Sequence, residues 1–148
     1  MALGMKAFAD ITGKTIVAID AEEEGEEVRF AFSDGTKAML YHDDDCCEYV
    51  RLCDIAGNLS DIIGAPILKA EESSCSGYDV QKNAHLVRVD EGGKPLCAGP
   101  VPPDEGDYDT FTWTFYHIVT RKGYVTLRWL GESNGYYSER VDFREVRE

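Results

Sequence analysis

The sequence predicts an α+β fold made mostly of antiparallel β-sheet, with one short helix near residues 58–63. Two observations lead to this prediction. Several short segments alternate apolar and polar residues, which is the pattern of a strand with one buried face. Asp-Gly and Asn-Gly pairs lie between such segments and favour tight hairpin turns. A chain of 148 residues fits a single domain, 1–148, whose core needs neither metals nor disulfides.

The first part of the chain is expected to contain a strand followed by a hairpin. Lys14–Asp20 is rich in β-branched residues and is predicted to be a short strand. Val28–Phe32 places its apolar residues on one face of a second strand. Asp34-Gly35 favours a tight turn, after which Thr36–His42 is expected to return as the partner strand.

The middle of the chain alternates extended segments with one helical turn. Glu48–Cys53 is predicted to be a strand, with a helix as the weaker alternative. Asn58 is suited to cap one or two helical turns over Leu59–Ile63, which would end at Gly64. The segment Ile67–Glu72 follows a proline and is expected to be extended.

Two loop-like segments, 73–84 and 91–109, flank a predicted strand at Ala84–Asp90. The second loop carries several Gly and Pro residues and no periodic apolar pattern. A loop of that length is uncommon in a compact domain and is typical of a mobile or functional segment.

The last third of the chain has the clearest strand pattern. Thr110–Val119 alternates aromatic and polar residues, and Tyr124–Leu130 alternates in the same way. Asn134-Gly135 favours a second hairpin turn that leads into Tyr136–Val146. We predict that these three strands form a meander and that their aromatic side chains make the main core.

Negative charge is concentrated in the first three quarters of the chain. The protein has 15 Lys and Arg against 28 Asp and Glu, a net charge of −13. Residues 1–110 hold 23 of the acidic and nine of the basic residues, a net of −14. Such a field repels nucleic acid and anionic lipid and speeds encounter with a cationic partner. We therefore expect a basic protein surface as partner and no direct binding of nucleic acid or membranes; a charge that serves solubility alone is the alternative. The sequence leaves the oligomeric state open.

The cysteines and the N-terminal segment predict a cytoplasmic protein. Five cysteines make an odd set, and the first residues do not form the apolar region of a secretory signal. No run approaches the ~20 apolar residues that a membrane-spanning helix needs. Reduced thiols are expected in that compartment. The sequence shows no nucleotide-binding or other cofactor motif, so no cofactor is expected.

Two long motifs give the chain a family resemblance. The first is HDDDCCE at residues 42–48, continued by IGAPIL at 63–68; the second is WTFY at 113–116, continued by RWLGESNGYYSE at 128–139 and VDF at 141–143. The chain resembles a domain of unknown function that occurs in bacteria and their phages. The resemblance covers roughly residues 28–72 and 110–143. It implies a bacterial or phage setting and no particular reaction.

Candidate binding residues fall into two acidic patches and one turn. Carboxylates in a patch attract cationic groups, and tyrosines are favoured anchors at interfaces. The turn also has a purely structural explanation, because Asn-Gly supplies the backbone angles of a two-residue hairpin. The candidates are Glu22, Glu23, Glu24, Glu26, Glu27, Asp43, Asp44, Asp45, Glu132, Ser133, Tyr136 and Tyr137.

A metal or thiol site is the alternative kind of site. Imidazole, thiolate and carboxylate are zinc ligands, and the weak candidates are His42, Asp45, Cys46 and Cys47. The spacing argues against one shared ion, because adjacent cysteines on a strand point to opposite faces. Neighbouring aspartates also raise a thiol's pKa, which opposes a nucleophilic role.

These observations lead to two hypotheses. The first is a non-enzymatic acidic binding protein, in its sharpest form a phage-encoded inhibitor that engages the basic surface of a host defence protein that handles nucleic acid. The second is a metal-dependent or thiol enzyme that uses the cluster at residues 42–47. No residue stands out as catalytic.

Overall fold

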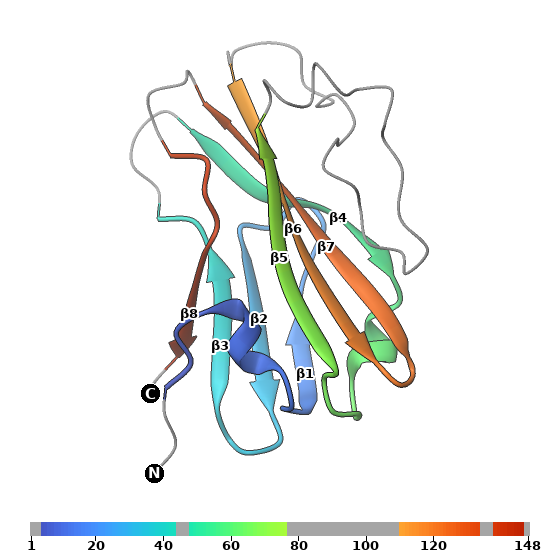
Figure 1. Cartoon of the computed structure of the whole chain (residues 1–148). Helices are drawn as coiled ribbons and strands as arrows, with labels where there is room; N and C mark the ends of the chain where they lie inside the picture. Colours follow the sequence, from blue (N-terminus) through green and yellow to red (C-terminus); the bar gives the residue numbers. More distant parts are fainter. Residues whose placement is uncertain (1–3, 44–47, 77–109, 134–137, 147–148) are drawn as a thin grey trace.

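The computed structural model describes residues 4–43, 48–76, 110–133 and 138–146. Within these ranges, two four-stranded antiparallel sheets pack face to face (Figure 1). The strands of the first sheet are, in spatial order, β1 (Ile16–Asp20), β2 (Glu27–Phe32), β3 (Lys37–Tyr41) and β8 (Asp142–Val146). Those of the second sheet are β4 (Tyr49–Gly57), β7 (Gly123–Ser133), β6 (Thr110–Thr120) and β5 (Lys69–Ser76).

The expected helix is a single 3₁₀ turn, so the described part of the chain is mostly β rather than α+β. It forms η2 (Leu59–Ile62), and Asn58 caps it by accepting a hydrogen bond from Ser60 N at 3.0 Å. The segment before Gly64 is too short for the hydrogen bonds of an α-helix to offset the unfavourable free energy of helix nucleation. A second 3₁₀ turn, η1 (Phe8–Ile11), was not predicted. Neither turn is long or apolar enough to cross a membrane.

Strands β2 and β3 pair antiparallel across a tight turn, with Phe30 opposite Ala38. Val28, Phe30 and Phe32 are all buried, as the alternation of the sequence predicts. Asp34 holds the turn closed. Its carboxylate accepts hydrogen bonds from Thr36 N and Thr36 Oγ1 and lies 2.5 Å from Lys14 Nζ.

We expect Asp34→Asn to lower stability at neutral pH and to lower it less in acid. Hydrogen bonds from Lys14 and Thr36 lower the pKa of Asp34 in the folded state. That stabilisation is complete above the unfolded pKa of about 4 and is lost progressively as the pH falls from there through the lower pKa of the folded state. Because the Asp34 side chain is 48% exposed, solvent screening limits the loss to less than about 1 kcal/mol at pH 7.

Urea unfolding at pH 7 and at about pH 3 tests this expectation. The difference between wild type and Asp34→Asn should shrink in acid. Asp20→Asn, which removes an exposed carboxylate with no ion pair among the described residues, is the control. An Asp34 variant whose deficit is the same at both pH values would contradict the electrostatic explanation.

The predicted C-terminal meander is wrong, because its third strand joins the other sheet. Strands β6 and β7 form a long antiparallel hairpin, with Tyr116 opposite Leu127. Strand β8 pairs with β3 instead of β7, with Phe143 opposite Leu40. It is also shorter than expected, beginning at Asp142; the predicted turn at Asn134-Gly135 lies outside the described residues. The chain between β7 and β8 therefore crosses from one sheet to the other.

The main core lies between the two sheets and includes Phe30, Leu40, Tyr116, Leu127 and Trp129, each at most 2% exposed. The prediction that the aromatic residues of the last strands form it is only partly right. Trp113, Phe115 and Leu130 lie on the opposite face of the second sheet, in a separate buried cluster. Alternation predicts that a strand has two faces but does not say which of them meets the other sheet.

Two other predicted boundaries differ from the structure. Strand β5 continues to Ser76, so the first residues of the expected 73–84 loop are strand. Strand β4 continues past Cys53 to Gly57 with a shift in register between Leu52 and Asp54. The predicted strand at Ala84–Asp90 and the loop at 91–109 lie outside the described residues.

Candidate functional site

The acidic run between β1 and β2 forms a turn that is hydrogen-bonded to the edge of the second sheet. Glu24 N donates to Leu52 O at 2.7 Å, and Leu52 N donates to Gly25 O at 2.7 Å. Glu24 has a positive φ of 67°, which is uncommon for a residue other than glycine. Backbone hydrogen bonds to β4 therefore hold the turn in place.

The structure brings this turn together with the end of β3. Glu27 pairs in register with Tyr41, which places the turn next to His42. A concave surface of about 400 Å³ lies between them. We call the exposed carboxylates of this region the acidic surface: Asp20, Glu22, Glu23, Glu24, Glu26, Glu27 and Asp43. Of the other acidic candidates, Asp44 and Asp45 lie outside the described residues.

Few cations neutralise the acidic surface. Arg29 pairs with Glu27 at 3.1 Å, and the Arg51 guanidinium lies 3.7 Å from Glu24. In the described part of the chain, the other five carboxylates of the surface form no ion pair. Burial raises the pKa of nearby Asp54, its ion pair with Arg128 at 3.2 Å lowers it, and the negative charge of Glu23 adds a smaller increase. The region is therefore locally anionic.

The side chain of His42 is held by polar contacts within the protein. Its Nδ1 lies 2.7 Å from Arg140 O, and its Nε2 lies 3.0 Å from Glu48 Oε1. Because both ring nitrogens face oxygen acceptors, both are suited to donate, and neither presents a lone pair to a metal. Across residues 4–43, 48–76, 110–133 and 138–146, no three His, Cys, Asp or Glu side chains lie close enough to hold a metal ion.

The thiol version of the alternative gains no support from the described residues. Cys46 and Cys47 lie outside them. Cys53 is a free, half-buried cysteine, and burial followed by the charge of Asp54 raises the pKa of its thiol. A raised pKa keeps the thiol protonated and unreactive at neutral pH.

The candidates Glu132 and Ser133 do not form an exposed tip. They belong to β7 and are 2% and 0% exposed. Arg51 Nη1 donates a hydrogen bond to Glu132 Oε1, so this carboxylate is half of a buried ion pair. Sequence reasoning missed the pairing because Arg51 and Glu132 lie 81 positions apart. Tyr136 and Tyr137 lie outside the described residues.

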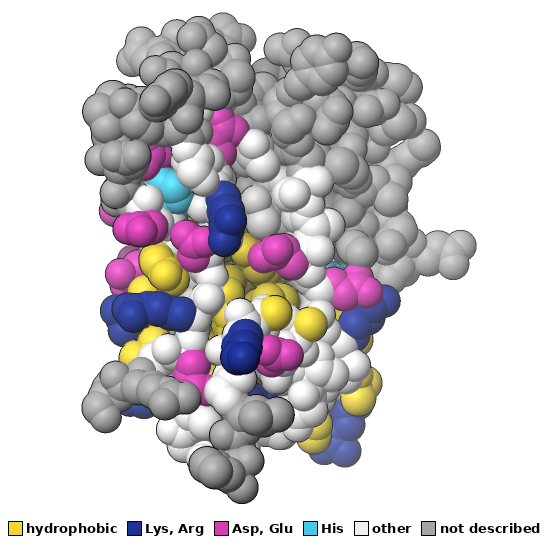
Figure 2. Space-filling model, turned by 60° about the vertical axis from the view of Figure 1, so that its left-hand side comes forward, with side chains coloured by type: hydrophobic (Ala, Val, Ile, Leu, Met, Phe, Trp, Pro, Cys, Tyr) yellow, Lys and Arg dark blue, Asp and Glu magenta, His cyan; other side chains and the backbone are white. Residues whose placement is uncertain are grey.

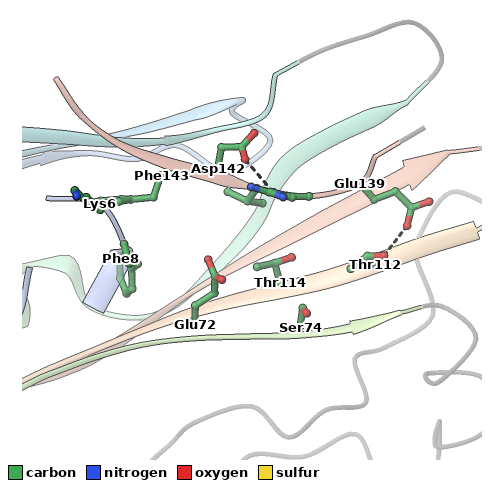
Figure 3. A pocket seen from close by; sticks show the side chains of 12 residues that line it. Lys6, Phe8, Glu72, Ser74, Thr112, Thr114, Glu139, Asp142 and Phe143 are labelled. Atoms are coloured by element: carbon green, nitrogen blue, oxygen red, sulfur yellow. Dashed lines mark hydrogen bonds and ion pairs between the residues drawn. The ribbon is translucent and has the colours of Figure 1, made fainter. Parts of the chain in front are cut away.

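A polar cleft that the sequence did not indicate opens between the two sheets where β5 and the 139–143 segment face each other. Its volume is about 750 Å³. Figure 3 shows Glu72, Ser74, Thr112 and Thr114 on strands β5 and β6, beneath the segment that carries Glu139 and Asp142. Lys6 and Phe8, from η1 and the residues before it, lie at one end.

Hydrogen bonds hold the walls of the polar cleft in place. Glu139 accepts from Thr112 Oγ1 at 2.6 Å and from Ser133 Oγ at 2.5 Å, which ties the crossing segment to β6 and β7. Arg140 pairs with Asp142 at 3.0 Å. Below them, burial and the neighbouring Glu72 carboxylate raise the pKa of Tyr116, which therefore stays protonated.

The sequence contains a faint signal of this cleft. The inner face of β6 changes from apolar residues to Thr114 and Thr112 towards its start, and Ser74 lies opposite Thr114. Polar side chains on the face that meets the other sheet are unusual, because that face is normally apolar. The signal becomes readable only when the inner face is known.

Comparisons with known proteins place the chain in a family without describing its activity. A search of curated proteins and a search of solved structures each returned no match. The match to a family model extends over residues 9–143 and includes both motifs of the sequence resemblance. The model is that of a domain of unknown function, DUF7448, and the chain belongs to this family.

Proposed function

We propose that this protein is a non-enzymatic binding protein that engages a basic protein surface through its acidic surface. The observation that carries the proposal is the fixed acidic turn. Its carboxylates are exposed, and the backbone that presents them is hydrogen-bonded to β4. A preorganised turn loses less conformational entropy on binding than a mobile one, so more of the attraction appears as affinity.

The distribution of charge supports a local rather than a general attraction. On the face that carries β8, acidic and basic side chains lie side by side (Figure 2). At the acidic surface, by contrast, seven described carboxylates face only the two arginine contacts given above. A basic partner would therefore be oriented towards the β1–β2 turn by the field of the protein.

The sharper form of this proposal is a phage-encoded inhibitor that acts in the bacterial cytoplasm on a defence protein that handles nucleic acid. Carboxylates on the acidic surface would occupy a groove that normally accepts phosphates. The phage setting implied by the motifs at 42–48 and 128–139 supports this form. If it is right, the protein and DNA compete for the same basic groove.

We expect Glu22→Gln/Glu26→Gln to weaken association with a basic probe protein such as cytochrome c. Binding of the wild type should itself weaken at least about tenfold between about 0.05 M and 0.5 M NaCl, because salt screens exposed charges. The double variant should show weaker binding at low salt and a smaller salt dependence. Isothermal titration calorimetry measures both effects.

The matched control is Asp61→Asn/Glu71→Gln, which removes the same number of charges from η2 and β5. It should leave the affinity close to that of wild type, since these residues lie outside the acidic surface. Equal weakening by both double variants would show that net charge alone matters. Binding that is insensitive to salt would remove the electrostatic mechanism.

A further inference from the structure

The polar cleft and the core residue next to its floor contain hydrogen-bonding groups that the described part of the protein does not use. Thr114 is only 6% exposed and lines the cleft, and its hydroxyl makes no hydrogen bond with any described residue. Trp129 lies opposite Thr114 on β7, and its indole N–H is buried without a hydrogen-bond partner. Buried polar groups are usually satisfied, so the Trp129 indole N–H is an exception, and it belongs to the residue paired with Thr114 of the cleft.

The charges around the cleft disfavour an ionic ligand. Lys6 and Arg140 lie at its walls together with Glu72, Glu139 and Asp142; Arg140 pairs with Asp142, and Glu139 already accepts hydrogen bonds from Thr112 and Ser133. A cationic ligand would lie beside the two basic side chains, and a phosphate would lie beside the carboxylates. Because side chains of both signs line the cleft, a ligand with a single charge would lie beside groups of its own sign, so a neutral ligand fits best.

The donors and acceptors of the cleft favour a ligand rich in hydroxyl groups. Carboxylates only accept hydrogen bonds, Lys and Arg only donate them, and the hydroxyls of Ser74 and Thr114 can do either. A ligand hydroxyl also does both, so it can satisfy any of these neighbours. The half-buried ring of Phe143 lines the same cleft and supplies an apolar surface for the C–H groups of a sugar ring.

We propose that the polar cleft binds a neutral polyhydroxylated ligand of mono- or disaccharide size, with the Thr114 hydroxyl at its floor. The volume of about 750 Å³ is in the usual range for small-molecule sites. The site is separate from the acidic surface, and its residues come from η1 and the segment before it, β5, β6 and the 139–143 segment. The ligand proposal can therefore be tested independently of the proposed function.

Titration of ¹⁵N-labelled full-length protein with maltose, cellobiose and N,N′-diacetylchitobiose tests the proposal. At sugar concentrations up to about 20 mM, a Kd near 1 mM is readily measured. The indole signal of Trp129 should shift, and that of Trp113, on the other face of the sheet, should not. Spermidine and inorganic phosphate are the charged probes and should leave the Trp129 signal unchanged.

Thr114→Val keeps the shape of the side chain and removes its hydroxyl. It should weaken sugar binding about fivefold to tenfold, the effect of one lost hydrogen bond. Thr126→Val makes the same change on the opposite face of the same sheet and should leave the affinity unchanged. Ser74→Ala, at an exposed position of the cleft, gives a second test if the Thr114 variant does not fold.

Three results would overturn the proposal. The first is no Trp129 shift with any of the three sugars. The second is a shift that neither Thr114→Val nor Ser74→Ala weakens. The third is tighter binding of spermidine or phosphate at the same signals, which would assign the cleft to a charged ligand.

Discussion

We expect Glu132→Gln to lower the free energy of unfolding by about 3–5 kcal/mol, a large part of the stability of a domain this size. The side chains of Arg51 and Glu132 are 1% and 3% exposed, so both charged groups are desolvated. The substitution keeps the shape of the side chain and removes the buried carboxylate that pairs with the Arg51 guanidinium. Removing the buried partner of a buried charge is costly, and the contact of Arg51 with Glu24, at 3.7 Å, is too exposed to offset the loss.

Urea unfolding followed by circular dichroism measures the effect. Glu27→Gln is the matched control, because it removes the same charge from an ion pair whose side chains are about half exposed. It should cost less than about 1 kcal/mol. The double variant Arg51→Met/Glu132→Leu should recover most of the stability, since apolar residues of similar volume often replace a buried ion pair without loss.

Two outcomes would contradict this account of the pair. One is a Glu132→Gln variant within about 1 kcal/mol of wild type, which would mean that water reaches the pair. The other is a double variant that is less stable than Glu132→Gln. The double variant also keeps the prediction testable if the single variant fails to fold.

The second large effect is expected for Gly131→Ala, which should destabilise the protein by about 2–3 kcal/mol. The crossing segment lies directly against the backbone of Gly131. A Cβ atom there would lie 2.5 Å from Glu139 O and 2.9 Å from Glu139 Cβ, closer than real contacts allow. The segment would have to move away, and the hydrogen bonds from Thr112 and Ser133 to Glu139 would be strained or lost.

Hydrogen exchange distinguishes this clash from a general loss of stability. In Gly131→Ala, protection should fall most in the crossing segment and β8, whose position depends on Glu139. Gly35→Ala is the control: its φ of +89° also disfavours alanine, but no atom lies within 4 Å of the added Cβ. Unchanged exchange at residues 138–146 in the Gly131 variant would show that the segment does not depend on this close approach.

Most individual strands were predictable because their signal is local. Val28–Phe32 and Tyr124–Leu130 alternate with a period of two, and such a pattern depends only on residues next to each other in the chain. The pairing of β8 was not predictable in this way. Its partner, β3, is about a hundred residues earlier in the chain, and Glu139, just before β8, lies against Gly131 of the other sheet.

The candidate sites show the same difference between local features, which the sequence predicts, and contacts between distant residues, which it does not. The composition showed that the turn at residues 22–27 is acidic and exposed, since a run of glutamates cannot be buried without partners. Composition could not show that Glu132 is buried, because its partner Arg51 is distant in sequence. The polar cleft was missed for the same reason, since its walls come from segments that meet only in the folded chain.

The sequence by itself therefore determined the strands, the uneven charge and the family resemblance of this protein. Tertiary structure alone decided which sheet each strand joins, which carboxylates stay in water, and where a cleft opens between the sheets. The physical reason is the separation of the interacting residues along the chain. Alternation and net charge follow from neighbouring residues and composition, whereas burial, ion pairing and cavities follow from contacts between residues far apart in the chain.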